Sequence, residues 1–173
     1  MTRYAVFLRG VNVGGVNLKM AEVAAALRDA GFTGVRTVLA SGNVLLDSRA
    51  GAASVREKAQ KALRDAFGYD AWVLAYDLDT VRAISQAYPF EREVEGHHSY
   101  VTFVADDEVL DELAARAADA GPQERIARGD GVLYWQVPRQ ATLDSAIGKT
   151  MGKKRYKATT TTRNLRTLEK LLR

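Results

Sequence analysis

The chain has 173 residues and a mass of 19.0 kDa, with 25 Lys and Arg, 21 Asp and Glu, two His and no Cys. This length suits one domain or two small ones, which can bury a core without covalent cross-links. The lack of Cys excludes disulfides, thiolate zinc sites and cysteine nucleophiles, and the longest apolar runs, such as 71–76, are too short to span a membrane.

The first half of the chain alternates strand and helix patterns. Short apolar runs predict four strands, at 4–8, 35–40, 44–47 and 71–76. Apolar residues at helical spacing predict a helix from Met20 that ends before Gly31, and a second that ends at Gly68. Ser54 and Glu57 have the spacing of a capping box at the start of this second helix. The order β-α-β-β-α-β is that of a ferredoxin-like plait.

The second half repeats this order with one element missing. Strands are predicted at 99–104, 123–128 and 132–137, and helices at 79–88 and 106–117. A last helix is predicted after Thr161 or Thr162, which would cap it, so no sequence remains for a closing strand. We therefore expect an α+β protein of two tandem ferredoxin-like plaits, at 1–88 and 97–173. The second plait is either an incomplete β-α-β-β-α or completed by pairing with the first.

The positive charge of the chain is concentrated near its carboxyl end. Residues 148–173 contain nine Lys and Arg and a single acid, Glu169, which gives +8, whereas the first 147 residues carry −4. Such a basic segment indicates a polyanion, a phosphate-bearing ligand or an acidic surface of the same chain as its partner.

A Gly-rich loop and a tight turn are expected to meet at one rim of the first plait. The loop 10–19 follows the first strand at Arg9, and the turn Ser41-Gly42-Asn43 follows the second strand. Because a helix crosses between these strands, they run in the same direction and end on the same rim. Glycines let a backbone approach a ligand closely, and an arginine provides a planar fork for carboxylate or phosphate. A purely structural role for these turn residues is the alternative.

Other chemical motifs are weak in this sequence. His97 and His98 are neighbours on an expected strand start, so they point to opposite faces and we interpret them as a surface pair rather than a metal site. No set of residues for acid–base or nucleophilic catalysis is recognisable. We assign no catalytic residues, metal or cofactor, and whether the protein is an enzyme stays open. Without a signal-peptide pattern we expect it to be cytoplasmic, with no membrane partner.

Three segments together carry a family resemblance. In their order and spacing they resemble a bacterial family known as domain of unknown function 1697. The segments are Leu8-Arg9-Gly10-Val11-Asn12-Val13-Gly14-Gly15, Ser41-Gly42-Asn43-Val44 and Thr161-Thr162-Arg163-Asn164. The resemblance covers nearly the whole chain. It implies a cytoplasmic α+β protein related to ferredoxin-like plaits, no established activity, and a joint importance of Arg9, Asn12, Ser41, Asn43, Thr162, Arg163 and Asn164. Leu165 stands where we would expect an aromatic residue, so the sequence does not support stacking there.

Our first functional hypothesis is a site for an anionic ligand, with a phosphate-bearing molecule as the favoured class. The rim and the basic carboxyl-terminal segment would form it together. Its residues are Arg9, Asn12, Gly14, Gly15, Ser41, Asn43, Lys149, Lys153, Lys154, Thr162, Arg163 and Asn164.

Two alternatives remain. One is a non-catalytic nucleic-acid-binding protein that uses the basic segment. The other is a scaffold that forms a homodimer through an exposed edge strand of the incomplete second plait.

Overall fold

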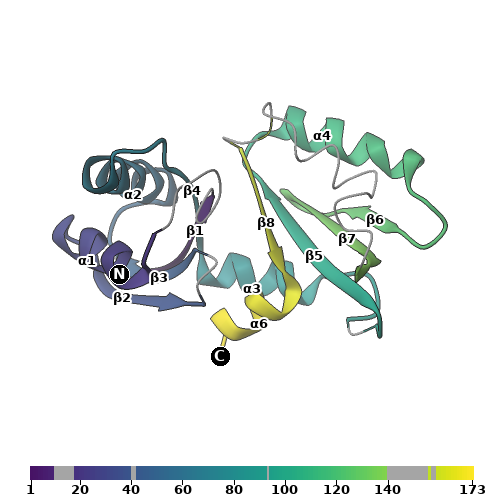
Figure 1. The fold of residues 1–173 in the computed structure, drawn as a ribbon, viewed down its shortest axis with the longest axis horizontal. Helices are drawn as coiled ribbons and strands as arrows, with labels where there is room; N and C mark the ends of the chain where they lie inside the picture. The colour runs from purple at the N-terminus through teal and green to yellow at the C-terminus, as the bar shows by residue number, and fades with distance from the viewer. Residues whose placement is uncertain (10–17, 40–41, 93, 140–155, 157–158) are drawn as a thin grey trace. The chain divides into compact units, whose positions relative to one another are not determined.

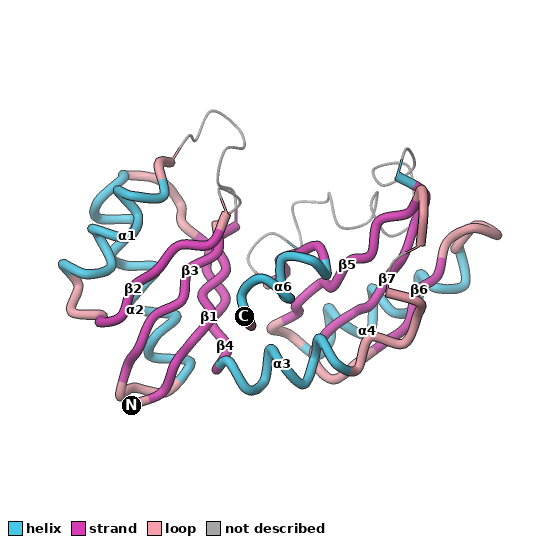
Figure 2. Tube along the Cα trace, turned by 90° about the horizontal axis from the view of Figure 1, so that it is seen from below, coloured by secondary structure: helices cyan, strands magenta, loops and turns pink. Residues whose placement is uncertain are grey.

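The structure of the chain is a computed structural model that describes residues 1–9, 18–39, 42–92, 94–139, 156 and 159–173. The chain divides into two compact units. The first comprises Met1–Val81 with Lys170–Arg173, and the second comprises Arg82–Glu169. Figure 1 labels the helices and strands of both units, and Figure 2 shows the same elements by type.

The first unit contains one four-stranded sheet and two helices on one of its faces. Its elements are β1 (Thr2–Arg9), α1 (Met20–Asp29), β2 (Thr33–Val38), β3 (Asn43–Ser48), α2 (Ala52–Phe67) and β4 (Trp72–Asp77). The strand order is β2-β3-β1-β4, and all neighbours are antiparallel. Because β1 and β2 both run antiparallel to β3, they run in the same direction and end on the same rim, as the sequence predicts.

The core of this unit lies between the sheet and its helices. Alternate residues of β1, among them Val6 and Leu8, point to the helical face, where Leu27 of α1 and Leu63 of α2 are completely buried. Figure 2 shows both helices on this side of the sheet. The capping-box prediction is wrong, because α2 begins at Ala52 after Gly51, and Ser54 lies inside the helix.

The second unit has its own sheet, again with four strands. Its elements are most of α3 (Leu78–Gln86), β5 (His97–Val104), α4 (Asp107–Ala115), the 3₁₀ turn η1 (Arg116–Asp119), β6 (Arg125–Arg128), β7 (Val132–Pro138), β8 (Thr160–Asn164) and most of α6 (Leu165–Leu171). The strand order is β6-β7-β5-β8 with antiparallel neighbours. Asp106 caps α4 by accepting hydrogen bonds from the N–H groups of Glu108 and Val109.

The prediction of an incomplete second sheet is wrong. Thr160–Asn164 forms β8, which pairs with β5 from Tyr100 to Val104 and supplies the fourth strand. Four consecutive threonines are β-branched and suit a strand, but they lack the apolar alternation by which half-buried strands are recognised. The expected capping role of Thr161 or Thr162 is also wrong, because α6 begins at Leu165 and Asn164 binds its first turn. The dimer hypothesis thereby loses the missing strand that motivated it.

The core of the second unit lies between its sheet and α4. Leu110 and Leu113 of α4 are buried against Leu133 and Trp135 of β7. The chain is thus an α+β protein whose described strands form two four-stranded antiparallel sheets. Within the described ranges, no helix is both long and apolar enough to cross a membrane.

Candidate functional site

The predicted rim of the first unit is formed where β1 ends. The backbone N–H of Leu8 donates to the carbonyl oxygen of Gly42 at 2.8 Å, and Phe7 pairs with Asn43. Arg9 therefore lies beside the start of β3. Its side chain is half-buried, and this burial lowers the pKa of its guanidinium from the usual value.

The turn between β2 and β3 has residues with a structural role. Asn43 is completely buried, and its Nδ2 donates to the carbonyl oxygen of Val38 at 3.0 Å across the turn. The backbone of Leu39 has a positive φ of 62°, a conformation that residues other than glycine rarely adopt. The residue is 46% exposed. The contact of Asn43 supports the structural interpretation of this residue.

The predicted residues of β8 belong to the second sheet. The hydroxyls of Thr162 and Thr102 lie 2.8 Å apart, and Thr102 accepts a hydrogen bond from Nε1 of Trp135 at 2.9 Å. Arg163 is buried, and its Nη1 donates to the Thr161 hydroxyl and the Thr162 carbonyl oxygen. The Thr162 contact connects β8 with β5, and the Arg163 contacts lie within β8, which is a structural use of both residues.

The remaining predicted residues cannot be placed. Asn12, Gly14, Gly15, Ser41, Lys149, Lys153 and Lys154 lie outside the described residues. Arg9 and Asn43 belong to the first unit, and Thr162, Arg163 and Asn164 belong to the second. The expected joining of the rim and the basic segment in one site stays a prediction.

The second unit contains a cleft of about 510 Å³ at one rim of its sheet. Here β5 begins at His97, opposite Pro138 at the end of β7, while Asn164 at the end of β8 pairs with Tyr100. The cleft, which we call the basic cleft, is lined by Arg92, Val94, Glu95, His97, His98, Ser99, Arg139, Asn164, Leu165 and Arg166. The described lining residues include three arginines and one carboxylate. Among the described residues of the predicted site, Asn164 alone lines this cleft.

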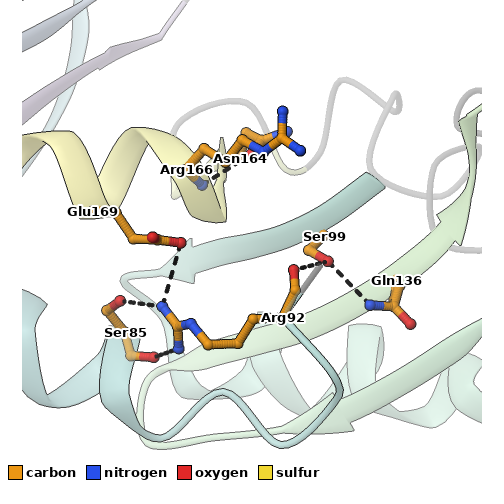
Figure 3. Close-up of polar contacts among 7 residues, drawn as sticks. All are labelled: Ser85, Arg92, Ser99, Gln136, Asn164, Arg166 and Glu169. Carbon is orange, nitrogen blue, oxygen red and sulfur yellow. Dashed lines mark hydrogen bonds and ion pairs between the residues drawn. The ribbon is translucent and has the colours of Figure 1, made fainter. Parts of the chain in front are cut away.

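Arg92, one of the residues that line the basic cleft, has several hydrogen bonds within the protein. Its guanidinium donates to the Ser85 carbonyl oxygen at 2.7 Å and to the Ser85 hydroxyl at 3.1 Å, and it lies 3.6 Å from a carboxylate oxygen of Glu169 (Figure 3). Its own carbonyl oxygen accepts from the Ser99 hydroxyl, to which Gln136 donates at 3.0 Å. Arg92 is therefore largely engaged by the protein, and its charge is balanced by Glu169.

Arg139 and Arg166 are the other two arginines among the described lining residues. The backbone N–H of Arg139 donates to the Gly96 carbonyl oxygen at 2.9 Å, and that of Arg166 donates to Asn164 Oδ1 at 2.9 Å, so both residues are fixed at the cleft. Both side chains are exposed. Within the described ranges, no carboxylate forms an ion pair with either guanidinium.

The positive charges of the cleft act on the imidazole of His98. Its half-buried ring lies 5.5 Å from the ring of Tyr100. Burial lowers the pKa of His98 below its usual value, and the charges of Arg139 and Arg166 lower it further. The imidazole is therefore close enough to both arginines for their charges to act on it. His97 also lines the cleft, and its Nδ1 lies 3.1 Å from the Glu95 carbonyl oxygen.

The sequence of the chain also matches a known protein family. A family described as a protein of unknown function (DUF1697) matches residues 1–134 of the chain. The chain belongs to this family. The match confirms the resemblance inferred from the sequence motifs. No functionally curated protein matches the chain.

Solved structures place this DUF1697 chain in a fold shared with at least one other protein. The conserved bacterial protein SP0830 from Streptococcus pneumoniae has a TM-score of 0.79 and 23% sequence identity, over 98% of this chain and 96% of that one. At this identity the similarity concerns the fold alone. An unknown protein from Galdieria sulphuraria is 12% identical over 94% of this chain and 96% of its own, with a TM-score of 0.28, too low to support an argument.

Sequence reasoning missed most of the basic cleft of this DUF1697 chain. His98 was set aside as a surface residue, and neither Arg139 nor Arg166 was singled out. His98 comes close to the end of β7 through the antiparallel pairing of β5 with β7, and the sequence does not show that these two strands pair. Recognition of β8 would have brought Asn164 and Arg166 to the same rim. In the described part of the chain, no three His, Asp or Glu side chains form a group that could hold a metal ion.

Proposed function

We propose that the protein binds a small anionic ligand in the basic cleft of its second unit. The observation that carries this proposal is that Arg139 and Arg166 both line the cleft, while no described carboxylate pairs with them. Two arginines that line one cleft and have no described ion-pair partner repel one another, so an anion between them lowers the electrostatic free energy.

The chemistry of the lining favours a phosphate-bearing ligand. Guanidinium groups present N–H donors in a planar fork that matches the oxygens of phosphate or carboxylate. The cleft adds the amide of Asn164 and the imidazole of His98 as neutral polar groups. Its volume of about 510 Å³ lies in the range of small-molecule sites. Glu95 is the one carboxylate among the described lining residues, and its charge opposes the binding of an anion.

Calorimetric titration with inorganic phosphate tests this function. We expect saturable binding to the wild-type protein, and a loss of at least about tenfold in affinity in Arg139→Gln and in Arg166→Gln, because each removes a charge-assisted contact. Arg125→Gln is the matched control, since Arg125 is an exposed arginine of the same unit outside the cleft lining. Undetectable binding, or an equal loss in the control, would contradict the proposal.

The predicted rim of the first unit is tested by the same titration. If Arg9 belongs to the ligand site, Arg9→Gln should weaken phosphate binding while the protein still unfolds at nearly the wild-type temperature. A large loss of stability in this variant would instead assign Arg9 a structural role. Binding of nucleic acid, the alternative from the sequence, would appear as affinity for an oligonucleotide that falls steeply with salt.

We further propose that the first unit is a ferredoxin-like plait. Its order β-α-β-β-α-β with the sheet order β2-β3-β1-β4 supports this assignment. The second sheet, β6-β7-β5-β8, repeats the same order when its strands are numbered from β5. A shared plait would make the two units structural repeats of one motif.

A further inference from the structure

We infer that the basic cleft selects a doubly charged phosphoryl group, as in a phosphate monoester, and takes up a proton at His98 when this group binds. The inference rests on the proposed anion site and adds to it the charge class of the ligand and a proton linkage. A phosphate diester, which carries a single charge, is the ligand class that the cleft should reject.

The geometry places His98 between groups of one sign. It stands one residue after the start of β5, with Arg139 following β7 on one side and Arg166 in the first turn of α6 on the other. Tyr100 is its neighbour on the same strand face, with ring centroids 5.5 Å apart. The other charged or titratable groups of the described lining are Arg92, paired with Glu169, Glu95 on the segment before β5, and His97 at the start of β5.

The charge balance of these groups favours a dianion. Arg139 and Arg166 contribute two positive charges with no described ion-pair partner, and a protonated His98 would contribute a third. Glu95, which also lines the cleft, offsets one of the three. A dianion neutralises the remaining charge of the described lining, whereas a monoanion leaves this lining with a net positive charge. A phosphate monoester carries about −1.5 to −2 near pH 7, so it matches this requirement.

The same balance links binding to protonation. In the ligand-free protein, burial and the two arginines hold the pKa of His98 below 6.5, so the imidazole is mainly neutral at pH 7. A bound dianion cancels the field of both arginines and adds an attractive charge of its own, which raises the pKa of His98. The protein therefore takes a proton from the solvent onto the imidazole as the anion enters, and releases it when the anion leaves.

Sulfate and methyl sulfate separate these effects, because neither ion titrates near neutral pH. Sulfate represents the monoester dianion and methyl sulfate the diester monoanion. We expect calorimetry at pH 7 to show at least about tenfold weaker binding of methyl sulfate. For sulfate, the observed heat should vary with the ionisation enthalpy of the buffer, with the sign of proton uptake. Uptake should vanish in His98→Gln and persist in Arg125→Gln, because Arg125 is an exposed residue of the same unit outside the cleft lining.

The outcomes keep the two proposals apart. If neither sulfate nor inorganic phosphate binds, the anion site itself is wrong. If sulfate binds but methyl sulfate binds equally well, or if the heat is independent of the buffer, the anion site stands and the present inference is overturned. Proton uptake that persists in His98→Gln would likewise overturn it, because the proton would then belong to another group.

Discussion

Asn164 Oδ1 accepts a hydrogen bond from the backbone N–H of Arg166 at 2.9 Å, at the residue where β8 ends and α6 begins (Figure 3). An amide oxygen in this position satisfies a backbone donor that the first turn of a helix leaves unpaired. The contact also fixes the position from which the Arg166 side chain enters the lining of the basic cleft. One side chain thus stabilises the strand–helix junction and positions a charge.

Substitutions of Asn164 separate these two roles. Asn164→Ala should lower the free energy of unfolding by about 1 kcal/mol, because the backbone donor loses its partner. Asn164→Asp keeps an acceptor oxygen, so its stability should stay within about 0.5 kcal/mol of wild type, while its charge opposes an anion in the cleft. Urea denaturation measures the first effect and calorimetry with sulfate the second. Unchanged sulfate affinity in Asn164→Asp would show that this residue does not face the ligand.

The pKa of His98 predicts a pH dependence of stability. Because burial and the arginines hold this pKa below 6.5, the folded protein binds a proton at His98 less readily than the unfolded chain. The associated stability is complete above pH 6.5 and is lost as the pH falls below this value. Between about pH 7 and pH 5, wild type should therefore lose more free energy of unfolding than His98→Gln in urea titrations. Equal losses in the two proteins would place the histidine in an unperturbed environment.

Removal of a single buried hydroxyl from the second sheet should lower the free energy of unfolding. Thr102 is completely buried and accepts from Trp135 Nε1 at 2.9 Å. Thr102→Val keeps the shape of the side chain but leaves the indole N–H without this acceptor, which should cost about 1–3 kcal/mol of unfolding free energy. The matched background is Trp135→Phe, in which the same substitution should cost at least about 1 kcal/mol less. Equal costs in both backgrounds, measured by urea denaturation, would show that the two groups are not coupled.

The backbone of Leu39 predicts a stabilising substitution. Leu39 has a φ of 62°, where a Cβ atom crowds the following carbonyl oxygen, and 46% of the residue is exposed. Leu39→Gly should raise the free energy of unfolding by about 1 kcal/mol because this crowding is relieved. Leu39→Ala keeps the Cβ and should stay within about 0.5 kcal/mol of wild type. If alanine stabilises as much as glycine, the exposed apolar surface is the cause rather than the backbone.

Elements with a periodic apolar pattern were the predictable part of the fold. The strand around Val6, which is a run of buried residues, and the helix that carries Leu63 were located to within a few residues. The start of α2 was displaced, because Ala52 has a high helix propensity and extends the helix ahead of Ser54. The polar strand β8 was missed altogether, since its stability comes from pairing with β5 rather than from its own sequence pattern.

The candidate site was less predictable, because its residues become neighbours only through strand pairing. Arg139 and Arg166 lie far apart in the sequence and reach the start of β5 from different sides. Asn164 was found through its motif. The sequence does not distinguish these two arginines from other surface arginines, because only the pairing of the strands shows which residues lie at the rim of the sheet.

The pairing of β8 with β5 also has a consequence during synthesis of the chain. Thr102 and Thr162, which face one another across these strands, are 60 residues apart in sequence. While the ribosome is still adding the intervening residues, β5 has an open edge that could join a strand of another nascent chain. A chaperone that shields this edge until residue 164 has emerged would therefore improve the yield of folded protein. Truncated chains that stop before residue 160 should be the most prone to aggregate.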